Sequence, residues 1–381
     1  MLSAVRSHPA LAAAGAAAFS MSTLFSAMKP VMLTRFVEQL AISDAVAGLI
    51  VALPFAGIAC ASLVVRGALL RMSFRLAAGL LCLVLLVAEA ASAYLYEQLL
   101  LVGSLQFLSG ICVGALMGLT SRVIATTRFA PELFGLVDMI AVLLMSFMVY
   151  LVGNSVASGG LEGGFLVATA ICALFTVVIL AAQDVGGGES REAAAGGPLK
   201  ISLPNIAAVL MGVGFVTVSG LGFAFMFTMA GRLDMGYEAA SSQIGVLLFL
   251  SSFACLAGGW AGGRFGAMRP LLCAFVACGA GWWAAVHADH AWVFLAALVP
   301  AVFALQFAFP ILMAYCARLD EEGRWAAIAT PIITSGFAWA AIFAGLLVSN
   351  FGLDSLASAT VLGLVVCAGL LLHSARGYRR A

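Results

Sequence analysis

Long apolar segments alternate along the chain with short polar stretches, and a strict alternation of apolar and polar residues is absent. An α-helix needs about 20 apolar residues to cross a bilayer, and an open sheet edge is not stable in lipid. We count twelve such segments, near residues 12–34, 45–65, 76–96, 99–120, 133–155, 161–182, 203–229, 244–262, 270–288, 292–315, 326–349 and 355–374. The pattern predicts an all-α integral membrane protein with twelve transmembrane helices.

One polar stretch, residues 183–200, is longer than the others and holds five charged residues and five glycines. It separates residues 1–182 from residues 201–381, which are parts of almost equal length. Equal parts on either side of a flexible linker indicate two similar units. We therefore expect an N-terminal six-helix bundle at 1–182, a linker at 183–200 and a C-terminal six-helix bundle at 201–381.

The composition excludes several classes of function. Hydrophobic residues make up 64% of the chain and charged residues 9%, whereas soluble proteins have about 25% charged residues. The net charge is +1 and no basic cluster is present, so we expect no nucleic-acid partner. The nine cysteines form neither a CxxC motif nor a cluster with histidine, so we expect no metal and no other cofactor. No serine or cysteine has a base nearby in a triad-like pattern, so the chain is not predicted to be an enzyme.

The basic residues predict the orientation, because cytoplasmic loops are enriched in Lys and Arg. With the N-terminus in the cytoplasm, 15 of the 18 basic residues fall in cytoplasmic loops or tails, and only Lys29, Arg35 and Arg232 lie outside. One missed helix would disturb this alternation, so the distribution also supports the helix count. We expect both termini and the linker to be cytoplasmic and the protein to lie in the inner membrane of a bacterial cell.

The two parts also match in sequence detail. The fourth segment ends with Arg122 and Arg128, and the tenth ends with Arg318 and Arg324, so that both pairs are offset by 196 residues. The dipeptide Leu-Met precedes the first arginine of each pair at the same offset. These matches predict a six-helix duplication.

Six plus six helices around a long cytoplasmic middle loop resemble the major facilitator superfamily of transporters over essentially the whole chain. That family carries a Gly-x-x-x-Asp-Arg-x-Gly motif with further basic residues between helices 2 and 3, and again between helices 8 and 9. The second copy here runs from Gly259 to Arg269 and has Gly263 in place of the aspartate. The first copy, at 67–75, is weaker and also lacks the aspartate, so the cytoplasmic latch that this residue supports in the family must use other residues here.

The family's Arg-x-x-Gln-Gly pattern in helix 4 appears as Gln106-Phe-Leu-Ser109-Gly110, with Gln106 in place of the arginine. The resemblance implies that helices 1, 4, 7 and 10 line a central cavity, while helices 2, 5, 8 and 11 lie between the halves. The candidate substrate-binding residues that follow are Lys29, Ser22, Ser26, Gln106, Ser109, Ser219, Phe223, Gln306 and Phe309.

Lys29 follows Ser22 and Ser26 at the spacing i, i+4, i+7, which places the three residues on one face of a helix. A cation on a polar stripe in the membrane would attract an anionic substrate such as a carboxylate. The alternative is that Lys29 extends to the outer interface, or pairs with Glu38 or Asp44.

Glu89 is the most deeply placed charge of the apolar segments. An ionised carboxylate there costs about 2.5–3.5 kcal/mol, so we expect it to be protonated or paired. It is a candidate proton-coupling residue. The alternative is a neutral glutamic acid hydrogen-bonded between packed helices.

Asp138 lies about two turns into helix 5 from the cytoplasmic side, at the expected interface between the halves. It is a gating candidate, because pairing with Arg264, Arg318 or Arg324 would replace the missing latch aspartate. Pairing with Arg122 in its own half is the alternative.

These observations predict a secondary active transporter, a symporter that moves a small organic solute by alternating access with proton coupling. The solute would be an amphipathic anion if Lys29 faces the cavity. An efflux pump for hydrophobic compounds is the alternative, because residues 222–229 are dense in Phe and Met and suit an apolar ligand. A non-transporting membrane scaffold or sensor is a third hypothesis. We expect a monomer whose partners are a small-molecule substrate, the lipid bilayer and protons.

Overall fold

The computed structural model describes residues 8–42, 44–65, 72–182, 201–235, 237–320 and 323–378. The predicted linker at 183–200 lies outside the described residues. The secondary-structure elements of the described part are helices, and their bounds are Pro9–Leu40 (α2), Asp44–Val65 (α3), Phe74–Leu95 (α4), Leu99–Ala125 (α5), Ala130–Ala181 (α6), Leu203–Ala224 (α8), Met226–Arg232 (α9), Tyr237–Phe265 (α10), Met268–Val286 (α11), Ala291–Ala317 (α12), Arg324–Thr334 (α13), Gly336–Phe351 (α14) and Ser355–Tyr378 (α15).

These helices make twelve crossings. α6 contains two, whereas α8 with α9 and α13 with α14 make one crossing each. Eleven spans in the described part are long and apolar enough to cross a membrane, and α3, with its shorter apolar stretch Val46–Ser62, is the twelfth. The predicted twelve-helix fold is confirmed, and most predicted bounds differ from the observed ones by a few residues. The exceptions are α2 and α10, which extend about two turns beyond the predicted segments.

The turn between the fifth and sixth crossings is made by a single glycine. Gly160 has φ 61° and ψ −151°, a backbone conformation that side-chain-bearing residues rarely adopt. The amide of the next residue, Leu161, donates to the Gln39 side-chain oxygen of α2 at 3.0 Å. This bond satisfies an amide at the start of the sixth crossing, where the helix itself offers no acceptor.

Two crossings that the sequence predicts as continuous helices are broken. α8 stops at Ala224, and α9 starts after Phe225, whose φ is −110°. α13 stops at Thr334, three residues after Pro331, and α14 follows Ser335. Both breaks lie in the C-terminal half of the chain, and each divides its crossing into two segments.

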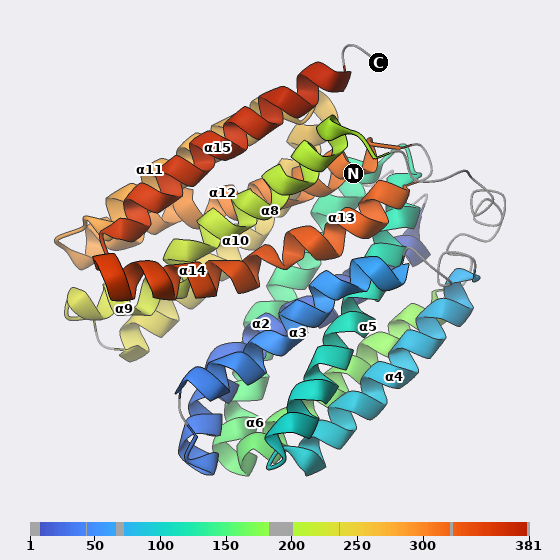
Figure 1. The fold of residues 1–381 in the computed structure, drawn as a ribbon, viewed down its shortest axis with the longest axis vertical. Coiled ribbons are helices and arrows are strands. Elements are labelled where there is room, and N and C mark those ends of the chain that lie inside the picture. Colours follow the sequence, from blue (N-terminus) through green and yellow to red (C-terminus); the bar gives the residue numbers. More distant parts are fainter. Residues whose placement is uncertain are drawn as a thin grey trace.

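We call the helix ends that adjoin residues 183–200 the linker side, and the other ends the opposite side. α2–α6 form one half of the molecule and α8–α15 the other (Figure 1). The packing follows one scheme in both halves: α3 lies on α5 as α10 lies on α12, and α4 lies on α5 and α6 as α11 lies on α12 and α15. The same six-helix arrangement is therefore built twice.

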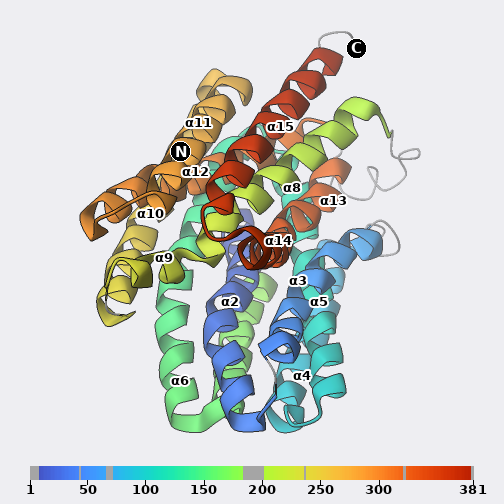
Figure 2. The same ribbon diagram turned by 60° about the vertical axis from the view of Figure 1, so that its left-hand side comes forward.

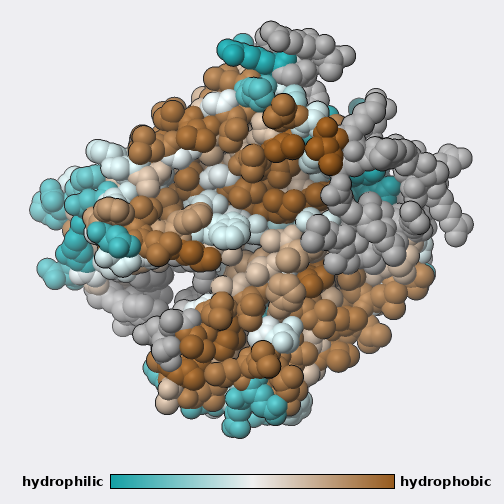
Figure 3. Space-filling view, in the orientation of Figure 1, coloured by the Kyte–Doolittle hydropathy of each residue, from teal (hydrophilic) through white to brown (hydrophobic). Residues whose placement is uncertain are grey.

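The halves meet at the linker side and diverge toward the opposite side (Figures 1 and 2). Most contacts between them are made by α10 with α6, by α13 with α3 and α5, and by α12 with α6. The space-filling view shows a gap between the halves on the side of α9 (Figure 3). The molecule is thus closed at the linker side and open at the opposite side.

Glycines allow the helices within each half to approach closely. A Cβ atom added to Gly57 of α3 would overlap the carbonyl oxygen of Phe107 on α5, and one added to Gly258 of α10 would overlap that of Phe307 on α12. Small residues at helix contacts are typical of membrane proteins, because packing drives association there.

The outer surface is apolar along whole helices. On α4 the exposed side chains Leu76, Leu80, Leu83 and Val87 follow a helical spacing, and the last two are each 60% exposed. Hydrophobic colour covers broad areas of both halves (Figure 3). Monomeric soluble proteins rarely expose continuous patches of this kind, so lipid is the solvent that these faces require. The protein is a multi-pass membrane protein.

Candidate functional site

A buried polar cluster joins α4 to α5 within the N-terminal half. The Gln106 amide nitrogen donates to Glu89 Oε1 at 3.2 Å and to Ser92 Oγ at 3.2 Å. Ser92 donates in turn to the Ala88 carbonyl at 2.8 Å. Glu89 and Ser109 are fully buried, and Glu89 Oε2 has no hydrogen-bond partner among the described residues. The Ser109 hydroxyl of α5 lies within hydrogen-bonding reach of the same carboxyl group.

The structure explains how the cluster forms. Glu89 lies six residues before the end of α4, and Gln106 lies seven residues after the start of α5. At a rise of about 1.5 Å per residue both are about 10 Å from the turn that joins the two helices. They therefore face one another at equal depth from the opposite side.

A narrow pocket lies next to this cluster, and Gln106 lines it. Its cavity volume is about 20 Å³, which is room for about one water molecule in this conformation. Its other walls are apolar side chains of α2, α3 and α6: Phe25, Met28, Met32, Phe36, Ile50, Val51, Pro54 and Phe165. Gln106 is thus both the donor to Glu89 and the polar side chain in the wall of the pocket.

The polar stripe predicted on helix 1 is only partly accessible. Ser22 is buried and Ser26 is half-buried. Lys29 lies on α2, but its side chain is outside the described part of the structure. Glu38, one predicted partner of Lys29, pairs with Arg35 at 3.1 Å.

The candidate residues of the C-terminal half do not join the cluster. Ser219 is buried inside that half and accepts from the Cys278 thiol of α11 at 3.4 Å. Phe309 is also buried, whereas Phe223 and Gln306 are half-buried. Gln106 and Ser109 likewise face α4 within their own half. In this conformation Ser219 and Phe309 are therefore buried in one half, and Gln106 and Ser109 are buried in the other.

A close backbone contact between the halves joins α6 to α10 at the linker side. A Cβ atom added to Gly135 would lie 2.7 Å from the Cys255 carbonyl oxygen and 3.0 Å from the Gly259 Cα atom. One added to Gly259 would lie 2.6 Å from the Pro131 carbonyl oxygen. The absence of side chains at both positions lets the two backbones touch.

Asp138 lies one turn from Gly135 in this same contact. It is 5% exposed, and its Oδ2 has no hydrogen-bond partner in the described part of the chain. The thiol of Cys255, which is fully buried, lies within hydrogen-bonding reach of its carboxyl group.

The predicted pairing of Asp138 with Arg264, Arg318 or Arg324 is not observed in this conformation. Arg264 is exposed and stacks over Trp260 and Phe265. Arg318 is exposed at the end of α12, and Arg324 pairs with Asp320 of its own half at 3.2 Å. The physical reason is the distance from the linker-side surface. Asp138 lies eight residues inside α6, while these arginines lie at helix ends on that surface.

A second inter-half contact lies nearby. Gly323, with φ 65°, precedes α13, and a Cβ atom added to it would lie 2.6 Å from the Arg122 carbonyl oxygen of α5. The Asp320 carboxylate accepts from the amides of Arg324 and Trp325 and so caps the start of α13. The cap fixes the turn that carries Gly323.

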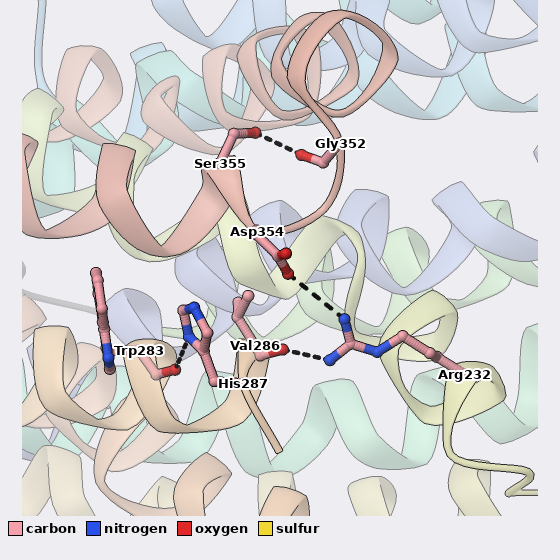
Figure 4. Close-up of polar contacts among 7 residues, drawn as sticks. All are labelled: Arg232, Trp283, Val286, His287, Gly352, Asp354 and Ser355. Atoms are coloured by element: carbon pink, nitrogen blue, oxygen red, sulfur yellow. Dashed lines mark hydrogen bonds and ion pairs between the residues drawn. The ribbon is translucent and has the colours of Figure 1, made fainter. Parts of the chain in front are cut away.

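At the opposite side, Arg232 holds three elements of the C-terminal half together (Figure 4). From the end of α9 it donates to the Val286 carbonyl at the end of α11, and it pairs with Asp354, which precedes α15, at 3.5 Å. His287 Nδ1 lies 2.9 Å from the Trp283 carbonyl oxygen, and the two rings stack with 4.8 Å between their centroids. Asp320, Arg232 and Asp354 carry contacts that the sequence alone did not single out.

One sequence signal would have pointed to Gln106. The tripeptide Leu-Gln-Phe occurs at 105–107 and again at 305–307, and both phenylalanine carbonyls lie against a glycine of the neighbouring helix. The offset of 200 residues is one helical turn longer than the 196 of the arginine pairs, so matching by arginines alone does not reveal it.

Comparison with solved structures shows the same architecture over 95% of the chain. The proton:xylose symporter XylE, bound to 6-bromo-6-deoxy-D-glucose, matches with a TM-score of 0.71 and 15% identity over 94% of its own chain. The human organic anion transporter MFSD10 (TETRAN) matches with 0.70 and 16% over 98%. The transporter FucP in the outward conformation matches with 0.70 and 15% over 98%.

No protein-family model and no curated protein matches the chain. Identities of 15–16% establish the fold and not the chemistry. The duplicated six-helix packing and these three structures lead to one conclusion: the chain has the twelve-helix fold of the major facilitator superfamily.

Proposed function

We propose that the protein is a secondary transporter that carries a small organic solute across a membrane by alternating access. The observation that carries the proposal is the asymmetry of the two halves, which touch at the linker side and stand apart at the opposite side. Two such halves give access to a shared site from one side at a time. Residues 1–182 and 201–381 are the two units that rock, with 183–200 as their tether.

The linker side faces the cytoplasm in this proposal, because the basic residues concentrate there. Both termini are then cytoplasmic, and the conformation described is open to the outside. The inner membrane of a bacterial cell fits this orientation.

Glu89 is the proposed proton-coupling residue. It is a buried carboxylic acid with one unpartnered oxygen, and Gln106 links it to a pocket whose walls are otherwise apolar. A proton on Glu89 would neutralise a charge that has no cation beside it in the described structure. XylE is a proton:xylose symporter, so this fold supports proton coupling in at least one similar protein.

An amphipathic anion is the proposed solute. Lys29 would hold its charged group, and apolar walls such as Phe25 and Met28 suit the remainder. MFSD10, of the same fold, is an organic anion transporter. The same apolar walls favour the alternative, efflux of hydrophobic compounds.

The test uses the purified protein in liposomes that contain the pH-sensitive dye pyranine. Benzoate, D-xylose and L-fucose are added in turn, and the internal pH is followed. We expect one class of solute to enter together with protons. Glu89→Gln keeps an oxygen that can accept the hydrogen bond from Gln106 but cannot release a proton. It should therefore abolish the proton movement, while solute exchange at equal concentrations continues.

Lys29→Gln separates the two substrate hypotheses. It should abolish benzoate entry if the solute is an anion. Release of preloaded ethidium that is unaffected by Lys29→Gln would instead favour efflux of hydrophobic compounds. If no solute moves in either assay under any pH gradient, the transport proposal is wrong and a scaffold or sensor becomes the better hypothesis.

A further inference from the structure

We propose that Asp138 is a proton-binding site that controls the linker side: the protonated acid permits the two halves to close there, and the ionised acid favours their separation. The inference rests on the proposed alternating access but not on the identity of the solute. It concerns a different carboxyl group from Glu89. Glu89 is proposed to couple protons to solute movement, whereas Asp138 is proposed to control closure of the linker side.

The location of Asp138 is the first argument. It lies on α6 beside Gly135, where the backbone of α6 touches the backbone of α10 from the other half. The acid is therefore covered by the partner half and not only by its own helix bundle. Rocking the halves apart would uncover it to water at the linker side.

The absence of a compensating cation in this contact is the second argument. The ion pairs of the described residues are Arg35–Glu38, Arg232–Asp354 and Asp320–Arg324. None of them includes Asp138, which is 5% exposed and has an unpartnered oxygen. A carboxylate that is ionised and unpaired in such a site loses its hydration without a replacement, so the closed contact favours the neutral acid.

The groups that face Asp138 do not supply a charge. From α10 it meets Cys255, and the serines one turn further along, Ser251 and Ser252, donate to carbonyls of their own helix. The nearest charged residues of its own half, Arg122 and Glu132, lie at the ends of α5 and α6. Glu132 is directed toward Gly263 of α10, because a Cβ atom there would lie 2.7 Å from its Oε1.

Glu89 differs in this respect. Its hydrogen-bond partner Gln106 lies on α5 of the same half, so rocking that half as a rigid body does not break their contact. Asp138 is covered by both halves. The same motion therefore moves its carboxyl group from a contact that excludes water to an environment that contains water. On opening, the proton passes from the Asp138 carboxyl group to water at the linker side; on closing, it is taken up from there.

The sign of the linkage follows. Closure binds a proton, so acid favours the closed linker side and raising the pH favours opening. With a single linked proton, the ratio of open to closed molecules changes by at most about tenfold per pH unit.

The test measures the separation of the halves by pulsed electron paramagnetic resonance. Spin labels are placed at Thr126→Cys, directly after α5, and at Leu203→Cys on α8, which are exposed at the linker side of different halves. Cys60 and Cys273, the native cysteines with accessible surface, are replaced by serine. Labelling at pH 5 keeps Cys255 covered.

We expect the parent to shift from short to long distances between pH 5 and pH 9. Asp138→Asn, which cannot ionise, should keep the short distance throughout, and that distance at pH 5 also shows that the variant is folded. Glu162→Gln, which neutralises an exposed acid at the opposite side of the same helix, should respond to pH as the parent does.

Two results would overturn the inference: a parent with no pH response, or an Asp138→Asn variant that opens with pH as the parent does. The distances are measured without solute, so failure to find a transported compound does not affect the outcome. Conversely, a pH response that depends on Asp138 does not identify the solute or the role of Glu89. The liposome assay tests both of these separately.

Discussion

Gln106 and Glu89 are joined by a 3.2 Å hydrogen bond between two helices of the N-terminal half, and both side chains are almost completely buried. The bond supplies the one donor that Glu89 Oε1 has among the described residues. Its removal therefore leaves a buried acceptor without a partner, which is more costly than the loss of the bond itself.

Gln106→Leu should lower the free energy of unfolding by about 1–3 kcal/mol for this reason. Thermal unfolding of the purified protein in detergent measures the effect. Gln306→Leu is the matched control, because it has the same Leu-Gln-Phe context but is only half-buried and takes part in no hydrogen bond of the described structure. Equal losses for the two variants would contradict the importance of the Glu89 contact.

Gly135→Ala should weaken closure of the linker side without unfolding the protein. The added methyl group would lie 2.7 Å from the Cys255 carbonyl, and a backbone atom cannot move aside as a side-chain end can. Modification of Cys255 by N-ethylmaleimide at fixed pH, followed by peptide mass spectrometry, should become several-fold faster. Gly153→Ala on the same helix has no atom within 4 Å of its added methyl and should leave the rate unchanged.

Gly57→Ala should destabilise the N-terminal half, because the added methyl overlaps the Phe107 carbonyl oxygen of α5. Overpacking of this kind costs about 1–3 kcal/mol. Gly48→Ala, on the same helix with open space around it, serves as the control. The prediction fails if the unfolding temperatures of the two variants agree.

Asp354→Ala should have little effect on stability, whereas Arg232→Ala should have more. The ion pair between them is 3.5 Å long and its carboxylate is 73% exposed, so it contributes about 0–1 kcal/mol. Arg232 additionally donates to the Val286 carbonyl at the end of α11, where the helix itself offers no donor. Thermal unfolding at low and high salt distinguishes the ion pair from the hydrogen bond to the Val286 carbonyl, since salt screens only the ion pair.

The number of crossings and the duplication could be predicted from the sequence, because a backbone in lipid must satisfy its hydrogen bonds within helices. The contact between Gln39 and the turn at Gly160 could not be predicted in this way. The sequence predicts a turn near 155–161, but it does not reveal that a glutamine from the first crossing, 122 residues earlier, satisfies the amide at its end.

The candidate site was less predictable than the fold. Ser22, Ser26, Gln106 and Ser219 share helix faces with polar neighbours, but the rotation of each helix decides whether a face meets the cavity or its own bundle. Ser219 meets Cys278, and Gln106 meets Glu89. Such rotations depend on glycine contacts between helices, as at Gly57 and Phe107, which require knowledge of both partners.

The contact between Cys255 and the α6 backbone has a consequence for pharmacology. This thiol is fully covered while the linker side is closed, so a reagent can reach it only after the halves separate. An adduct bonded there would occupy the space between α10 and α6 in which the thiol now faces the Asp138 carboxyl group. A thiol-reactive compound would thus prevent the halves from closing again after they have separated once. The wild-type chain already carries the sulfur atom of Cys255 to which such a compound would attach.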